Sequence, residues 1–165
     1  MAFDDKLFKA GAGTLVINSQ TNSGAGGTEV VDGILEVTGF GKLNSGDVVV
    51  RANASRNVIL AIAQSPGEAP IAIDDTANVA LFSSGANRAL LNLNFSSSQS
   101  ETVNSLTVDG VLLLPGTYNA TTLPGSITGT GNLLVLIPEP SSAAFLLCGA
   151  GWLLGARMRR RKHGC

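Results

Sequence analysis

Short apolar runs recur along the chain at intervals of about 10 residues, separated by clusters of Gly, Asn, Ser and Asp. Apolar and polar residues alternate in many runs, which is the period of a strand with one buried face. No stretch before Ser141 has apolar residues at helical i, i+3, i+4, i+7 spacing. The pattern predicts an all-β body of short strands. The predicted strands lie within Thr14–Asn18, Thr28–Gly39 (two runs), Asp47–Ala52, Asn57–Ala63, Ile71–Asp75, Asn78–Ser83, Ala89–Ser96, Ser105–Leu114, Gly116–Thr121 and Asn132–Ile137.

Two similar pairs of segments indicate internal repetition. "VVDGIL" (Val30–Leu35) matches "TVDGVL" (Thr107–Leu112), and "GAGTLVI" (Gly11–Ile17) matches "GTGNLLVL" (Gly129–Leu136). An Asp-Gly pair between apolar runs is also a strong hairpin signal. Hairpins would give the antiparallel strands of a β-sandwich, whereas repeats would give a solenoid whose coils stack in parallel. The pattern alone leaves both folds open.

Residues Gly11–Gly39 resemble the autotransporter-associated β-strand repeat, which reads as a G-x-G-T-L strand, a turn ending in G-G-T and a V-x-x-G-x-L strand. The aromatic residue usual in that turn is absent. Leu106–Leu136 is similar to the segment that closes such proteins. The resemblance implies a right-handed parallel β-helix, with a β-sandwich as the alternative. The matching positions are Gly11, Gly13, Thr14, Leu15, Gly26, Gly27, Thr28, Val30, Gly33 and Leu35.

Charge is scarce in this chain and concentrated at one end. Charged residues make up 14% of the sequence and aromatic residues 5%, while glycine reaches 20 residues. The formal net charge is −1, yet many of the basic residues lie in the last ten positions, so the body is acidic. An acidic body offers no basic surface for nucleic acid, and the composition is too apolar for disorder. We therefore expect a folded body that does not bind nucleic acid.

The titratable residues predict no catalytic centre. The single histidine, His163, lies in the basic tail, which excludes most nucleophilic triads and histidine-based metal sites. Paired carboxylates occur at Asp4/Asp5 and at Asp74/Asp75. Neighbouring residues of a strand point to opposite faces, so Asp74 and Asp75 would not line one cleft if Ile71–Asp75 is extended. We expect them to cap a turn at the strand end.

Glycine and asparagine motifs also favour turns over binding sites. The G-x-G elements at Gly11–Gly13 and Gly129–Gly131 lack the helix and third glycine of a phosphate loop. The Asp-Gly pairs do not recur at the nonapeptide spacing of calcium-binding repeats. Asn53-Ala54-Ser55 and Asn119-Ala120-Thr121 fit the N-glycosylation pattern, for which chance suffices in a chain rich in these residues. The sequence predicts no catalytic residue, no cofactor, no metal ligand and no enzymatic activity.

The C-terminal segment combines three unlike pieces. Pro138-Glu139-Pro140 precedes an uncharged stretch, Ser141–Ala156, which a basic cluster follows. As a helix this stretch would measure about 24 Å, somewhat short of a ~30 Å hydrocarbon core. Trp152 near its basic end suits a membrane interface, and its glycines are common in membrane helices. Cys148 within the stretch and Cys165 at the terminus are not expected to form a disulfide. The cluster consists of Arg157, Arg159, Arg160, Arg161 and Lys162.

This order of pieces resembles the PEP-CTERM sorting signal. Pro138, Glu139 and Pro140 occupy the motif positions, and the arginine-rich cluster acts as the stop that stays cytoplasmic. The resemblance implies an exosortase-type membrane transpeptidase as partner, cleavage near the motif, and a single-pass inner-membrane intermediate. It also implies delivery to the cell envelope, surface or extracellular matrix, with extracellular polysaccharide as a candidate partner. An ordinary anchor that is never cut is the alternative.

The sequence thus divides into three parts: a segment 1–10, a β-repeat body 11–137 and a sorting signal 138–165. Residues 1–10 are interrupted by Asp4, Asp5, Lys6 and Lys9 and do not read as a signal peptide, so we expect an N-terminally truncated sequence. The expected function is that of an exported structural or adhesive surface protein. The alternative is a carbohydrate-binding or carbohydrate-active β-domain on the same tail.

Overall fold

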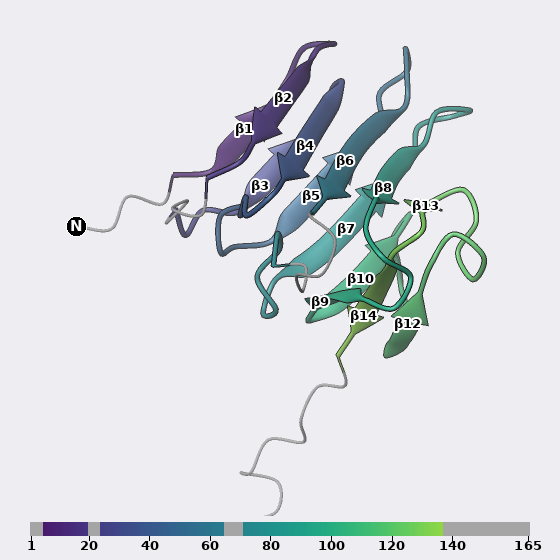
Figure 1. Cartoon of the computed structure of the whole chain (residues 1–165). Coiled ribbons are helices and arrows are strands. Elements are labelled where there is room, and N and C mark those ends of the chain that lie inside the picture. Colours follow the sequence, from purple (N-terminus) through teal and green to yellow (C-terminus); the bar gives the residue numbers. More distant parts are fainter. Residues whose placement is uncertain (1–4, 20–23, 65–70, 137–165) are drawn as a thin grey trace, which may run out of the picture.

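The computed structural model describes residues 5–19, 24–64 and 71–136, and every regular element in these ranges is a strand (Figure 1). The prediction of an all-β body is therefore confirmed for the described residues. The strands are β1 (Leu7–Lys9), β2 (Thr14–Ile17), β3 (Thr28–Val30), β4 (Ile34–Thr38), β5 (Val48–Arg51), β6 (Val58–Ala63), β7 (Asn78–Phe82), β8 (Ala89–Leu93), β9 (Ser100–Val103), β10 (Ser105–Val108), β11 (Val111–Leu112), β12 (Gly116–Tyr118), β13 (Ile127–Gly129) and β14 (Asn132–Val135).

Parallel pairing dominates, and it joins strands that are not adjacent in the sequence. One sheet has the order β1-β3-β5-β7-β10-β11, and a second has the order β13-β8-β6-β4-β2. From β1 to β8 the chain alternates between these two sheets, so that each strand pairs in parallel with the strand two positions later. The two sheets advance side by side from β1 and β2 to the C-terminal end of the body (Figure 1).

Antiparallel pairs occur only toward the C-terminal end of the described strands. β10 turns back into β11, and β12 pairs antiparallel with β14, which also pairs in parallel with β9. The β10–β11 turn has positive φ at both Asp109 (49°) and Gly110 (83°), which is the requirement of a type I′ turn. The hairpin signal of this Asp-Gly pair is therefore confirmed.

The second Asp-Gly pair, Asp32-Gly33, does not form a hairpin. β3 and β4 flank Asp32-Gly33, but they belong to different sheets and do not pair with each other. Gly33 has φ of +70°, and a Cβ at this position would lie 2.5 Å from the carbonyl oxygens of both Gly11 and Gly13. This pair therefore forms a corner, by which we mean a bend that joins a strand of one sheet to a strand of the other. It lies against the preceding corner at Gly11–Gly13, and the hairpin interpretation is wrong here.

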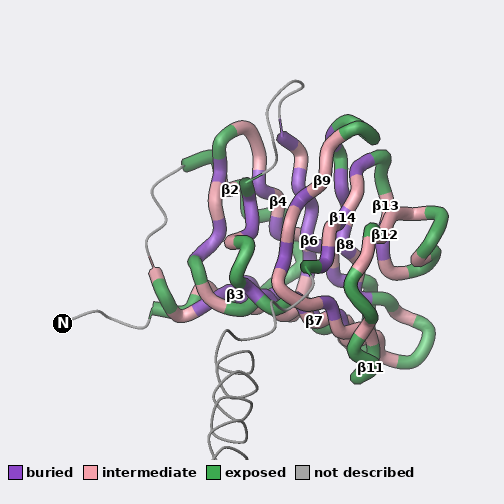
Figure 2. Tube along the Cα trace, turned by 90° about the horizontal axis from the view of Figure 1, so that it is seen from below, coloured by how far each residue is buried: buried purple, intermediate pink, exposed green. Residues whose placement is uncertain are grey.

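The core consists of rows of aliphatic residues that run across the strands in register. Leu35 on β4 pairs with Leu15 on β2 and with Leu60 on β6, and the row continues through Leu91 to Ile127. Leu35, Leu60 and Leu91 are 0% exposed. Burying such a side chain contributes roughly 1.5–3 kcal/mol relative to leaving it exposed. Alternate residues of the same strands face outward, so buried and less buried positions alternate along the chain (Figure 2).

Polar side chains connect successive corners. Asn53 donates its amide to the Val31 carbonyl at 3.1 Å and to the Asp32 carboxylate at 3.2 Å, while Asn87 donates to the Asn53 carbonyl at 3.0 Å. The bonds to the Val31 and Asn53 carbonyls satisfy backbone acceptors at the corners. Asn53 and Asn87 therefore tie one corner to the next.

The sequence pattern misplaces some strands. Ile71–Asp75, predicted as a strand, forms no named strand, although Ala72 and Ile73 are buried. β1, β9 and β13 are strands that the pattern did not predict. Each is only three or four residues long and is extended because it pairs with a strand remote in the sequence. So short a run carries too few apolar positions for the period to show.

Candidate functional site at the β1–β2 end

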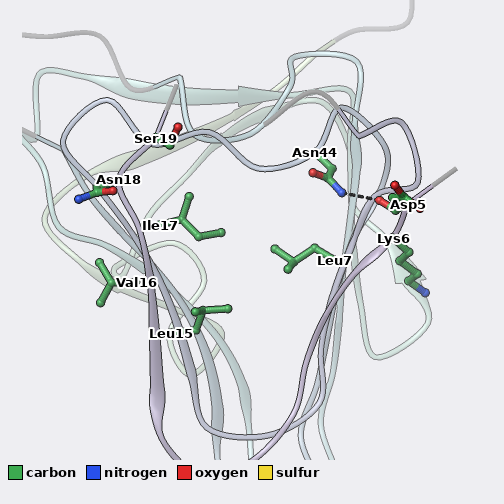
Figure 3. Close-up of a pocket in the computed structure, with 9 residues that line it drawn as sticks. All are labelled: Asp5, Lys6, Leu7, Leu15, Val16, Ile17, Asn18, Ser19 and Asn44. Carbon is green, nitrogen blue, oxygen red and sulfur yellow. Dashed lines mark hydrogen bonds between the residues drawn. The ribbon is translucent and has the colours of Figure 1, made fainter. Parts of the chain in front are cut away.

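A hollow lies between the first strands of the two sheets, with a volume of about 460 Å³ (Figure 3). Its walls come from the start of β1 with the two residues that precede it, from β2 with the two residues that follow it, and from one residue of the loop before β5. We call this region the β1–β2 end. The residues that line the hollow are Asp5, Lys6, Leu7, Leu15, Val16, Ile17, Asn18, Ser19 and Asn44.

The inner surface of the hollow is aliphatic. Leu7 points from β1 toward Leu15 and Ile17 of β2, whereas Val16 points away (Figure 3). Leu15 begins the row that continues with Leu35, but it is 39% exposed where Leu35 is 0% exposed. Among the described strands, Leu35 has a neighbouring strand on both sides and Leu15 on one side only, which accounts for the difference in exposure. At the β1–β2 end the hydrophobic core is therefore only partly covered.

One buried amide fixes the polar side of the hollow. Asn44 is 9% exposed and donates from Nδ2 to the carbonyl oxygens of Asp5 at 2.7 Å and Gly27 at 3.2 Å. The Leu7 amide also donates to the Gly27 carbonyl, at 3.0 Å. These bonds hold Asp5 and Leu7 against Gly27 and Asn44 of the next turn of the chain.

A three-membered ion cluster lies beside the hollow on the outer side of β3. Glu29 accepts from Lys6 Nζ at 2.6 Å and from Arg51 Nε at 3.0 Å. The hydrogen bond from Lys6 is the main reason why the pKa of Glu29 is lowered, with Arg51 acting in the same direction against partial burial. Arg51 also lies over the Phe82 ring, 4.3 Å from its centroid. Although Lys6 lines the hollow, its ammonium group is thus held against Glu29 and points away from the hollow (Figure 3).

A second hollow, of about 250 Å³, is lined by Lys42, Ile71, Ile73, Asp74 and Asp75. Near these residues Glu101 on β9 is 0% exposed and accepts from the Ile73 amide at 2.5 Å, while its Oε2 has no hydrogen-bond partner in the described part of the chain. Burial raises the pKa of Glu101 to about 7, against the lowering effect of the Ile73 and Ala72 amides. Sequence reasoning missed this residue, because nothing in the letters around "SETV" signals a buried carboxyl.

The paired aspartates behave as turn residues. Asp74 accepts from the amide and the hydroxyl of Thr76, at 2.9 and 2.6 Å, and these bonds lower its pKa. The predicted turn cap is confirmed for Asp74, although the preceding segment is not the predicted strand. Among the described residues no group of three His, Cys, Asp or Glu side chains is placed to hold a metal ion.

The two glycosylation-type asparagines are used within the fold. Asn53 Oδ1 accepts from the amides of Ser55 and Arg56, and Asn119 Oδ1 accepts from those of Thr121 and Thr122. Asn119 also donates to Asn132 at 3.1 Å. Both side chains therefore close their own turns, which is the ordinary role of asparagine in such sequences.

The predicted sorting residues lie outside the described residues. These are Pro138, Glu139 and Pro140 of the motif, the uncharged stretch, and Arg157, Arg159, Arg160, Arg161 and Lys162. In residues 5–19, 24–64 and 71–136 the structure contains no helix that could cross a membrane. Comparisons with protein-family models, with curated proteins and with solved structures found no match.

Proposed function

We propose that this chain is an exported structural or adhesive protein of the bacterial cell surface, carried there by its C-terminal sorting signal. Its body would be a right-handed parallel β-helix. The observation that carries the proposal is the order of pieces after residue 137: the Pro-Glu-Pro motif, an uncharged stretch and an arginine-rich terminus. Proline disfavours a helix, which suits a motif that a protease must bind, and the positive-inside rule predicts that the basic end would stay in the cytoplasm.

The described body supports the structural part of this proposal. Strands two positions apart pair in parallel through β1 to β8, as expected when each turn of the chain lies on the preceding one. Parallel crossovers within one sheet are almost always right-handed. The corners are joined by hydrogen bonds such as Asn53 to Asp32. A body of stacked turns would offer long outward-facing sheet surfaces, which suits a matrix component.

The sorting motif can be tested in the bacterium that makes the protein. Replacing Pro138, Glu139 and Pro140 by alanine should leave most of the chain uncut in the inner-membrane fraction, because the transpeptidase would lose its recognition site. The measurement is fractionation followed by immunodetection and by protease treatment of intact cells. The matched control replaces Ser141 and Ser142, next to the motif, by alanine and should reach the surface. Unchanged surface delivery of the triple variant would refute the sorting proposal.

A further inference from the structure

The end of the body at which β14 finishes carries exposed leucines. Leu114 is 79% exposed, Leu112 66% and Leu136 37%. β12 begins at Gly116, which pairs with Val135 at the end of β14 (Figure 1). Leu114 and Leu136 flank this pair, so both lie at the same end of the two strands. We call Leu112, Leu114 and Leu136 the apolar patch.

The backbone around the patch is fixed by contacts with β10. Leu113 packs against the core, and its amide donates to the Leu106 carbonyl at 2.9 Å. Leu112 pairs with Thr107 of β10. Because Leu113 is directed inward, Leu112 and Leu114 on either side of it are left on the surface.

No charge accompanies the patch. Residues 110–138 contain no Asp, Glu, Lys, Arg or His. The single tyrosine, Tyr118, lies on β12 and donates from its hydroxyl to the Leu114 carbonyl at 2.7 Å. This bond satisfies a backbone acceptor beside the patch, which lowers the cost of placing that acceptor in an apolar medium. An uncharged surface with a tyrosine beside leucines suits the boundary between lipid and water.

The length of chain after β14 keeps this end of the body close to the C-terminal stretch. Ser141, the first residue of the uncharged stretch, follows Leu136 by five residues. Five residues span at most about 17 Å. The headgroup region on one side of a bilayer is about 5–8 Å thick. When the stretch lies in the hydrocarbon, the end of β14 must therefore stay near the headgroups, and so short a tether favours lipid as the occupant over a separate protein.

We propose that the apolar patch contacts the lipid surface of the membrane that holds the uncharged stretch, with Leu112 and Leu114 in the headgroup region. The contact presents Pro138–Pro140 at that surface, where a membrane transpeptidase would cleave. The proposal rests on the proposed function, because it needs the stretch to lie in a membrane. Turns of chain stacked before β1 would lie at the other end of the sheet that ends in β11, and would leave the patch uncovered.

A fluorescent label at position 114 tests the contact in the full chain, with Cys148 and Cys165 replaced by serine. Leu114→Cys carries an environment-sensitive fluorophore, and the chain is inserted into vesicles of phosphatidylethanolamine and phosphatidylglycerol. A phospholipid with a nitroxide on its acyl chain should quench the label, and the vesicles should slow its quenching by aqueous iodide severalfold. Thr121→Cys is the matched control, because Thr121 is exposed in the same uncharged run but lies beyond the other end of β12. Its label should stay open to iodide.

Trp152 shows separately, in the unlabelled chain, whether the uncharged stretch lies in the lipid, because it is the single tryptophan. A quenched Trp152 with an unquenched label at position 114 would overturn the lipid contact and leave the sorting proposal in place. An unquenched Trp152 would contradict the membrane intermediate itself and, with it, the contact. Equal quenching of the labels at positions 114 and 121 would show that the tether alone brings the body to the lipid, and would also overturn the proposal.

A charge placed in the patch gives a second test. Leu112→Asp, in the chain labelled at position 114, should reduce the quenching by the lipid-borne nitroxide, because an aspartate is costly to place in lipid. Phe8→Asp is the matched control, since Phe8 is 58% exposed and lies on β1, at the other end of the sheet that ends in β11. This control should leave the quenching unchanged. Equal effects of the two substitutions would contradict the contact.

Discussion

Replacing Gly33 by alanine is expected to lower the free energy of unfolding by about 3 kcal/mol. Two costs combine at this corner. A residue with a Cβ is strained at φ of +70°, and the added Cβ would lie 2.5 Å from the carbonyl oxygens of Gly11 and Gly13. These are backbone atoms of the preceding corner, so the two corners must separate and the pairing of β2 with β4 must loosen. Equilibrium urea unfolding followed by circular dichroism measures the loss.

Gly39→Ala separates the two costs. Gly39 also has positive φ, +58°, but no atom lies within 4 Å of an added Cβ. Its alanine variant should therefore lose only the conformational part, about 1 kcal/mol. If the two variants lose the same stability, the corners at Gly33 and Gly11–Gly13 are not in contact, and the parallel arrangement of the first strands is incorrect.

The second large effect is a dependence of stability on pH that comes from Glu101. Its pKa rises from 4.5 to about 7 in the folded chain, chiefly because the carboxyl is buried. The folded state then holds this proton more tightly than the unfolded state. The resulting stabilisation is complete below pH 4.5 and is lost as the pH rises through about 7. It corresponds to about 3 kcal/mol between pH 4.5 and pH 8.

Glu101→Gln should remove this dependence and make the chain more stable than the wild type at pH 8. Glutamine keeps an oxygen that can accept from the Ile73 amide, but it carries no charge to bury. Urea unfolding at several pH values from 5 to 8 is the measurement. Glu36→Gln, on the outward side of β4, is the control and should retain the wild-type slope. A wild-type chain whose stability does not fall over this range would show that Glu101 is not buried as described.

The alternation of apolar and polar residues predicted most strands of the body, because one buried face imposes a period of two on the sequence. The alternation could not predict which strands pair with each other. Asp32-Gly33 and Asp109-Gly110 are the same dipeptide between apolar runs, yet one is a corner and the other a hairpin. The difference is set by Gly11 and Gly13, which lie against Gly33 from a remote part of the sequence.

The burial of residues at the candidate sites could not be predicted from the sequence either. No local pattern marks Glu101 as buried, because the amide it accepts from belongs to Ile73, on a segment that the apolar run suggested was a strand. Leu15 reads as an ordinary core residue of an alternating strand, and only the position of β2 at the edge of its sheet leaves it exposed. Burial of these residues depends on contacts between distant segments, which a single sequence does not contain.

The most direct test of the proposed function is the mass of the mature protein at the cell surface. Intact-mass analysis and peptide mapping should place its C-terminus near Pro138–Pro140. Peptides from Arg157 to Lys162 should occur only in the inner-membrane intermediate. A surface form that still carries those basic residues would contradict cleavage by a sorting transpeptidase and, with it, the central claim that this tail is a removable sorting signal.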